Sequence, residues 1–509
     1  MKSMDLPASA SAQARRPGQT QPISLASSES LSKKVIRGGI WVFTLRFTNR
    51  GLGFIRTIIL ARLLAPSDFG LLGIAMLAIS TLETFSQTGF QAALIQKKEN
   101  VESYLDTAWT ISVIRGMFLF ILLFFGAPLV AKFFNSAEAT LIIRVIAVTI
   151  LLSGIRNIGI VFFQKELEFN KLFFYESSAT VADLTVAIAL ALILRDVWAL
   201  VWGGLAAHCV RVFMSYMVHS YRPRISFEKA KFQELFGFGK WILGSSILIF
   251  LITQGDDVLV GKMLGVTALG FYQMAFLISN LPATEIAHVI SQVTFPAYSK
   301  FQDDLPKLRG AYLKVLQLTA FVSTPLAGGI FVLGPEFTEI FLGEKWMPMV
   351  PAIQILCLVG LARSIISTTS PVFSAMKKPG IGTKCQTMRL LLLCVLIYPF
   401  TIRWGLLGVS YAVLSSVAVS AFGFSSMVIK TLRCRFRKFA KMIILPLINT
   451  GIMCLTISFL NITIESVDIF YFILLILVAL INYILVSYLF DKFFKYGIQK
   501  LFKETLVRQ

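Results

Sequence analysis

Residues 469–490 read IFYFILLILVALINYILVSYLF, an unbroken apolar run without a charged side chain. At about 1.5 Å of rise per residue, a helix of this length matches the hydrocarbon core of a bilayer, which is about 30 Å thick. Backbone groups inside lipid must pair within the protein, so the run is predicted to be a membrane-spanning helix. The chain lacks the alternating pattern of a membrane β-barrel.

Similar apolar blocks recur along the whole chain. Its 509 residues are 56% hydrophobic and 15% charged, whereas soluble domains are about 25% charged. We therefore expect an all-α polytopic membrane protein with about fourteen transmembrane helices. The predicted spans are 37–61, 70–94, 107–131, 139–163, 173–194, 197–219, 236–260, 270–298, 311–333, 349–375, 384–402, 406–429, 441–461 and 467–490.

The net charge of +21 lies in short clusters between apolar blocks, and no nucleic-acid-binding motif is present, so no nucleic-acid partner is expected. An anionic inner leaflet explains such clusters better. If the N-terminus is cytoplasmic, few of the 48 Lys and Arg residues fall in outer loops. They are Arg62, Lys132, Arg195, Lys262, Lys345 and Arg403. This bias predicts that both termini are cytoplasmic.

The composition divides the chain into six segments. Residues 1–36 are rich in Ser, Ala, Gln and Pro and are expected to form a disordered cytoplasmic tail. The remaining segments are an N-lobe at 37–219, a basic cytoplasmic linker at 220–235, a C-lobe at 236–429, two further helices in 430–490, and a cytoplasmic tail at 491–509.

The two predicted lobes share residues at positions 200 apart. Gly39, Trp41, Arg62, Leu64 and Gly70 correspond to Gly239, Trp241, Lys262, Leu264 and Gly270. This offset spans an even number of predicted helices, so both lobes cross the membrane in the same direction. We expect a parallel repeat about an axis along the membrane normal.

Three stretches resemble bacterial polysaccharide flippases of the Wzx-like transporter family, of the colanic-acid and teichuronic-acid exporter type. They are RGGIWVFTLRF at 37–47, FIRTIILARLLAPSDFGLLG at 54–73 and SQTGFQAALIQKK at 86–98. The superfamily also contains MATE exporters and the lipid II flippase MurJ. The resemblance implies a MATE-like fold of two six-helix lobes around a central cavity, two additional C-terminal helices, and alternating access in the bacterial inner (cytoplasmic) membrane.

Polar side chains form a stripe on each of the first two predicted spans, since their spacing keeps them on one helix face. The members are Arg46, Asn49, Arg50, Gly53 and Arg56 on the first span, and Ser80, Glu83, Thr84, Gln87 and Gln91 on the second. Matched stripes favour a wet cavity whose excess arginine binds a phosphate or acidic sugar. The alternative is a buried structural network in which Glu83 pairs with one of these arginines.

Carboxylates inside the predicted spans are candidates for ion coupling, because such groups often carry protons or sodium ions. The candidates are Asp183, Asp256, Asp257 and Glu285. Asp183 is preferred, since it lies in the middle of an apolar span. Asp256 and Asp257 lie near the outer end of theirs, where a solvated helix cap is an alternative. A lone His288 is more typical of a core histidine than of a proton relay.

We expect no metal and no cofactor. The six cysteines form no C-x-x-C pair, and most lie in or beside apolar blocks. No P-loop is present, so the energy for transport is expected to come from a gradient.

The favoured function is a flippase for an undecaprenyl-diphosphate-linked oligosaccharide in surface polysaccharide biosynthesis. Its partners would be this substrate, membrane lipids, and a polymerase with export machinery, and no covalent chemistry would occur. A MATE-type multidrug or cation antiporter is the first alternative, but its mostly cationic substrates predict an acidic cavity. A membrane polysaccharide polymerase is the second, but it would need a large aqueous loop that the chain lacks.

Overall fold

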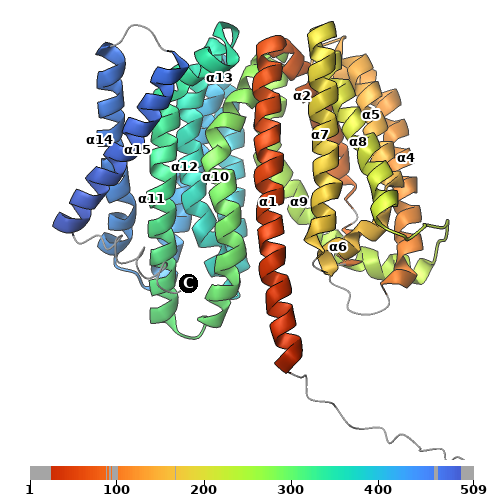
Figure 1. Ribbon diagram of the computed structural model, residues 1–509, viewed down its shortest axis with the longest axis horizontal. Helices are drawn as coiled ribbons and strands as arrows, with labels where there is room; N and C mark the ends of the chain where they lie inside the picture. The colour runs from red at the N-terminus through yellow and green to blue at the C-terminus, as the bar shows by residue number, and fades with distance from the viewer. Residues whose placement is uncertain are drawn as a thin grey trace, which may run out of the picture.

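The computed structural model describes residues 25–87, 89–90, 93–94, 101–166, 168–463 and 468–494. Throughout these residues the regular structure is helical and no strand occurs. Figure 1 shows two helix bundles side by side, with α1 between them and with α14 and α15 at the far edge of the second bundle. The predicted all-α architecture is confirmed.

The first bundle is the N-lobe. Its long helices are α1 (Leu25–Leu63), α2 (Pro66–Phe85), α4 (Glu102–Phe133), α5 (Ala139–Ile155), α7 (Phe169–Leu194) and α8 (Val197–Val218). Two short elements, η1 (Ile158–Ile160) and α6 (Val161–Lys165), lie between α5 and α7.

The second bundle contains the C-lobe and the two additional helices. Its elements are α9 (Lys229–Leu264), α10 (Val266–Lys300), α11 (Leu305–Phe337), η2 (Thr338–Leu342), η3 (Glu344–Met349), α12 (Val350–Ala375), α13 (Pro379–Leu432), α14 (Phe436–Thr463) and α15 (Ile469–Phe494). Helix α13 bends at Gly405, where the backbone has φ 56°. This kink divides α13 into the two spans predicted at 384–402 and 406–429.

Nine helices in the described parts of the chain are long and apolar enough to cross a membrane, or ten if α5 and the bent η1–α6 segment form one span. Every predicted span overlaps a helix. The membrane fold is thus confirmed, whereas the count of fourteen stays a prediction. Bulky apolar side chains such as Phe125, which is 73% exposed, face outward as lipid contacts require.

Several predicted boundaries were wrong. Helix α1 begins at Leu25, inside the expected tail, because a helix can continue beyond the hydrocarbon core. Helix α2 ends at Phe85 rather than at residue 94, and α5 ends at Ile155 rather than at 163. Both helices therefore end inside a predicted span, and the functional cavity described below lies at these ends.

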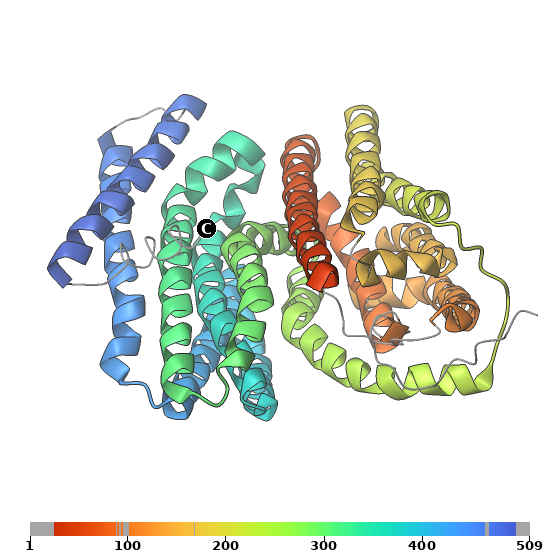
Figure 2. The same cartoon turned by 60° about the horizontal axis from the view of Figure 1, so that its bottom comes forward.

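The linker between the lobes is extended before α9 begins at Lys229. Figure 2 shows it passing along the edge of the N-lobe. Asp106 of α4 holds it by accepting hydrogen bonds from the Tyr221 hydroxyl and, at 2.9 Å, from the backbone N–H of Arg224. The backbone N–H of Ser226 donates to Thr110 Oγ1 at 3.0 Å. The linker is thus fastened to the N-lobe.

Helices α2 and α10 touch at their N-terminal ends through two reciprocal contacts. A Cβ added to Gly70 would overlap the carbonyl of Val266, and one added to Gly270 would overlap the carbonyl of Pro66. The residues of one contact are related to those of the other by the same offset of 200. Only glycine allows the two backbones to approach this closely.

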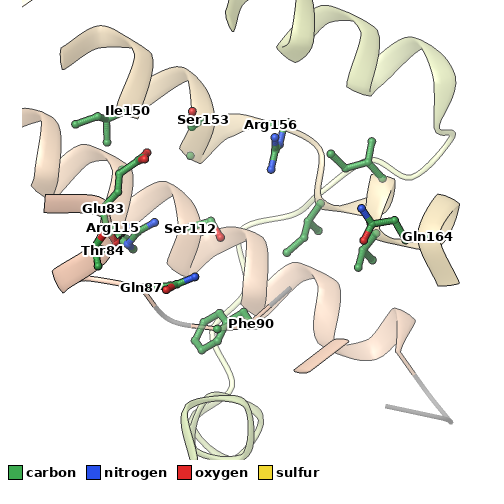
Figure 3. A pocket seen from close by; sticks show the side chains of 16 residues that line it. Glu83, Thr84, Gln87, Phe90, Ser112, Arg115, Ile150, Ser153, Arg156 and Gln164 are labelled. Atoms are coloured by element: carbon green, nitrogen blue, oxygen red, sulfur yellow. Dashed lines mark hydrogen bonds between the residues drawn. The ribbon is translucent and has the colours of Figure 1, made fainter. Parts of the chain in front are cut away.

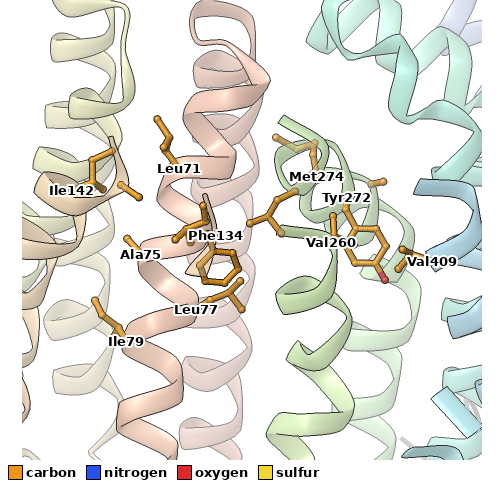
Figure 4. Close-up of a cluster of buried hydrophobic side chains, with 14 of the residues drawn as sticks. Leu71, Ala75, Leu77, Ile79, Phe134, Ile142, Val260, Tyr272, Met274 and Val409 are labelled. Atoms are coloured by element: carbon orange, nitrogen blue, oxygen red, sulfur yellow. The ribbon is translucent and has the colours of Figure 1, made fainter. Parts of the chain in front are cut away.

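Trp346 of η3 seals the same end of the molecule, which we call the Pro66 end. It is fully buried, with its ring 5.2 Å from Phe69 and 5.9 Å from Phe271 between centroids. Its Nε1–H donates to the carbonyl of Ala61 at 2.9 Å. Around this contact, the buried side chains of α2, α9 and α10 continue into one apolar cluster (Figure 4).

Arg62 and Lys345 add polar contacts between the lobes at the Pro66 end. Arg62 Nη2 donates to the carbonyl of Glu339 at 3.2 Å and also to that of Ile340. Lys345 Nζ donates to the carbonyl of Arg62 at 2.8 Å. Apolar packing and charge-assisted hydrogen bonds therefore close the lobes together at this end.

Gly70→Ala should lower the melting temperature of the purified protein, because the added methyl group overlaps a backbone carbonyl. Overpacking of this kind costs about 1–3 kcal/mol. Thermal unfolding followed by intrinsic fluorescence measures the effect, and Gly270→Ala should behave alike.

Gly126→Ala is the matched control, since a Cβ at this position in α4 would have no atom within 4 Å. It should be neutral or slightly stabilising. Equal melting temperatures for Gly70→Ala and Gly126→Ala would contradict the tight contact.

Candidate functional site: two connected cavities in the N-lobe

A cavity of about 700 Å³ lies among α2, α4, α5 and the η1–α6 segment. It is at the opposite end of α2 from Pro66, because its lining includes the last turn of α2 and the residues that follow. Its polar lining, most of it labelled in Figure 3, consists of Glu83, Thr84, Gln87, Ser112, Arg115, Ser153, Arg156 and Gln164. This volume suits a charged group of a few tens of atoms.

The backbone break after α5 brings Arg156 to this cavity. Arg156 has ψ 142°, which ends the helix. The Asn157 side chain accepts the Gly159 N–H at 2.9 Å and caps η1, while the Asn157 N–H donates to Ser215 Oγ at 3.1 Å. Asn157 Nδ2 also donates to the Tyr221 carbonyl at 2.7 Å. Contacts from α8 and the linker thus stabilise the break.

Arg115 of α4 is held by the C-terminal turn of α2. Its Nη2 donates to the Glu83 carbonyl at 3.0 Å, and its Nε donates to Ser86 Oγ at 3.1 Å. A cation at this place also complements the negative end of the helix dipole. The carboxylate of Glu83 is subject to the positive charges of both Arg115 and Arg156.

A second cavity, of about 280 Å³, adjoins the first and shares Ser153 and Arg156 with it. Its other lining residues are Leu152, Glu176, His208, Arg211 and Val212. Arg211 Nε lies 3.5 Å from Glu176 Oε2, and Arg156 Nη1 donates to the Tyr175 hydroxyl at 3.4 Å. Among the residues that the structure describes, the charged side chains that line the two cavities are thus three arginines and two glutamates.

Of the site residues predicted from sequence, Glu83 and Gln87 line the larger cavity, and Gln87 lies beyond the end of α2. The α1 residues Arg46, Asn49, Arg50 and Arg56 are not among the residues that line either cavity. Helix α1 packs instead on α7. The arginines whose charges act on Glu83 come from α4 and from the end of α5, in place of the α1 arginines that the alternative of a buried network invoked.

Asp183 lies in an apolar span, as predicted, and it has a charged partner. Its Oδ1 forms an ion pair with Arg56 Nη2 at 2.9 Å, and the two side chains are 25% and 18% exposed. Nearer the other end of the same helix pair, Ser177 Oγ donates to Asn49 Oδ1 at 3.2 Å. Two of the predicted α1 site residues therefore join α1 to α7.

Asp256 and Asp257 lie within α9, which continues to Leu264, so the alternative of a solvated helix cap was wrong. Asp256 is 3% exposed and accepts a hydrogen bond from the Tyr272 hydroxyl at 2.7 Å. The positive charges of Arg363 and Arg389 act on this carboxylate. Glu285 and His288 lie outside the described side chains.

The sequence-based prediction missed Arg115, Arg156, Arg211 and His208 as site residues. Arg156 and Asn157 precede Gly159 in a span that was read as continuous helix, and this pairing of a cap residue with glycine was the available signal for a break. His208 and Arg211 share a helix face by their spacing, which was a second signal.

Asp183→Asn should reduce the thermal stability of the purified protein, because Arg56 would lose its carboxylate partner within the membrane. We expect a loss of about 0.5–3 kcal/mol, and partial recovery in the double variant Arg56→Gln/Asp183→Asn. Thr185→Val, on an exposed face of α7, is the control. Normal stability with slowed transport in Asp183→Asn would instead favour the coupling role predicted from sequence.

Comparison with solved structures shows the fold. The lipid II flippase MurJ in its inward closed conformation gives a TM-score of 0.70 at 16% identity, covering 90% of this chain and 99% of that chain. An inward-facing multidrug resistance MATE family transporter gives 0.62 at 17% identity, covering 75% of this chain and 94% of that chain. The MATE-like fold expected from sequence is confirmed.

Comparison with known sequences identifies the family of this chain. The lipopolysaccharide biosynthesis protein WzxC of Escherichia coli is 28% identical over 71% of this chain and 74% of its own length. The teichuronic acid biosynthesis protein TuaB of Bacillus subtilis is 28% identical over 65% of this chain and 69% of its own length. The family model described as polysaccharide biosynthesis protein matches residues 59–351, which is more than half of the chain. The chain therefore belongs to this family of polysaccharide biosynthesis proteins.

Proposed function

We propose that this protein is a flippase that moves an undecaprenyl-diphosphate-linked oligosaccharide from the cytoplasmic to the outer leaflet of a bacterial inner membrane. Its relatives bear the names of lipopolysaccharide, teichuronic acid and succinoglycan biosynthesis or transport proteins. The observation that carries the proposal is the arginine-rich pair of cavities inside the N-lobe. The product would serve surface polysaccharide assembly, and a polymerase and export machinery would use it next.

The cavities suit an anion better than a cation. Arg115, Arg156 and Arg211 exceed Glu83 and Glu176 by one positive charge. A diphosphate presents several oxygens that guanidinium groups bind with paired hydrogen bonds. The serine and glutamine side chains of the larger cavity can donate further hydrogen bonds to sugar hydroxyls. A cation antiporter is disfavoured, since it needs the opposite balance of charge.

Translocation by alternating access needs one closed end and one accessible end. The lobes are joined at the Pro66 end through Gly70, Gly270 and Trp346. The larger cavity lies at the other end, beside the C-termini of α2 and α5. The loop charges predict that both termini are cytoplasmic. In this orientation the larger cavity lies at the cytoplasmic end, where it can take up substrate from inside the cell. Outward release then requires the contacts at the Pro66 end to separate.

No covalent step belongs to the proposed function. The cavity holds the diphosphate and the first sugars while the polyprenyl chain stays in lipid, and rocking of the lobes moves the head group. The polar residues of the cavity replace the water that the head group leaves behind, which lowers the cost of crossing the apolar core.

Arg156→Gln should reduce glycolipid flipping by about tenfold or more, because an arginine–anion contact contributes at least about 1.4 kcal/mol in a shielded site. The assay measures how fast a labelled glycolipid becomes accessible outside proteoliposomes.

The matched control is Arg144→Gln in α5, the helix that ends just before Arg156. Arg144 Nε donates to the Phe124 carbonyl at 3.3 Å, and Arg144 lines neither of the two cavities. This variant should flip normally. Equal activity in the two variants would contradict the role of the cavity.

The proposed orientation has its own test in a variant whose six native cysteines are replaced. Cysteines at Ser67 and Glu344 should react with an impermeant thiol reagent added outside cells, and a cysteine at Arg435 should not. Labelling at Arg435 together with protection at Ser67 would reverse the orientation.

A further inference from the structure

His208 of α8 lies at the smaller cavity, which adjoins the substrate cavity but has no assigned role. Its Nδ1 is 3.4 Å from Ser153 Oγ, and Ser153 lines both cavities. An imidazole is the side chain whose ordinary titration lies near neutral pH. At this position, the His208 imidazole is therefore suited to bind a proton when substrate enters the larger cavity and to release it when substrate leaves.

The charged and titratable groups around His208 come from each helix that encloses the smaller cavity. Helix α8 itself contributes Arg211, the end of α5 contributes Arg156, and α7 contributes Glu176 together with Tyr175. Burial disfavours a positive charge on His208, and both guanidiniums add to this effect. Glu176 is already paired with Arg211 at 3.5 Å. In the empty cavity, a positive charge on His208 would thus be repelled by two arginines and attracted by one carboxylate, which already pairs with Arg211.

An anion bound at Arg156 would reverse this balance. Its negative charge offsets the guanidiniums and favours the protonated imidazole, since opposite charges a few ångströms apart stabilise each other. The coupling is reciprocal by thermodynamic linkage. Protonation of His208 then raises affinity for the anion to the same degree that the anion favours protonation.

We propose that His208 is a proton-binding site that is filled together with the anionic head group, so that the diphosphate and one proton enter the N-lobe as a unit. This inference rests on the proposed function, because it takes the diphosphate to bind at Arg156. The proton balances part of the substrate charge while the lobes close around it. After release, the neutral imidazole leaves the empty cavity with one positive charge fewer on the return step.

Calorimetry of inorganic pyrophosphate binding to the purified full chain tests the proposal. Heats measured at one pH in two buffers of different ionisation enthalpy give the number of protons taken up. Wild type should take up more protons than His208→Gln, whereas proton changes on pyrophosphate itself are common to both. Between pH 8 and pH 6, wild-type affinity should rise about fivefold more than that of the variant.

His219→Gln is the matched control, because His219 follows the end of α8 and lines neither cavity. Burial, assisted by Lys171, lowers the pKa of His219. The control should keep the wild-type proton uptake. If His208→Gln binds pyrophosphate with wild-type uptake and wild-type pH dependence, the inference is overturned while the cavity proposal stands.

A second measurement does not depend on the folding of a variant. The chain contains three histidines, so nitrogen-15 NMR of labelled wild type can follow each imidazole. Saturating pyrophosphate near pH 7 should shift the His208 signal toward the protonated form and leave His219 unchanged. An unchanged His208 signal with bound pyrophosphate would overturn the inference. Absence of pyrophosphate binding to wild type would overturn both the anion cavity and this inference.

Discussion

The close approach of α2 and α10 at the Pro66 end is the constraint on which the arrangement of the two lobes depends. Gly70 and Gly270 let each backbone reach the carbonyl of the other helix, and Trp346 fills the space beside them. The contact is short and lies at one end of both helices. It leaves the opposite end of the N-lobe to form a cavity.

Charge inside the membrane provides the second constraint. An ionised side chain that faces lipid is costly, so each one needs a partner or a wet cavity. Arg56 and Asp183 pair between α1 and α7, and Asp256 lies in a C-lobe cluster with Tyr272 and two arginines. The N-lobe cavities keep an excess of arginine. An anionic substrate would neutralise this excess of positive charge.

The sequence predicted the helical membrane fold well, because hydrophobic blocks depend on bilayer thickness more than on tertiary contacts. It also predicted that Glu83 and Gln87 belong to one polar face. On α1, by contrast, Asn49 and Arg56 contact α7 and line neither of the two described cavities. Helical periodicity shows which residues share a face, but it does not show which neighbour that face meets.

The position of Arg156 was missed for a related reason. Its helix ends because Asn157 bonds to Ser215 of α8 and to Tyr221 of the linker, both far away in the sequence. The apolar pattern favours an unbroken span over 139–163, and the tertiary hydrogen bonds override it. His208 was missed similarly, since its significance comes from the Arg156 and Ser153 that this break brings near it.

Site-specific photo-crosslinking in native membranes shows whether the glycolipid head group enters the N-lobe cavity. A photoreactive amino acid would replace Ser112, which lines the cavity, or Phe125, which is exposed on the same helix. Entry of the head group into the cavity predicts saturable capture of the diphosphate-linked oligosaccharide from position 112, lost on competition with unlabelled glycolipid, and only non-saturable capture from position 125. Saturable capture from position 125 with none from position 112 would contradict it.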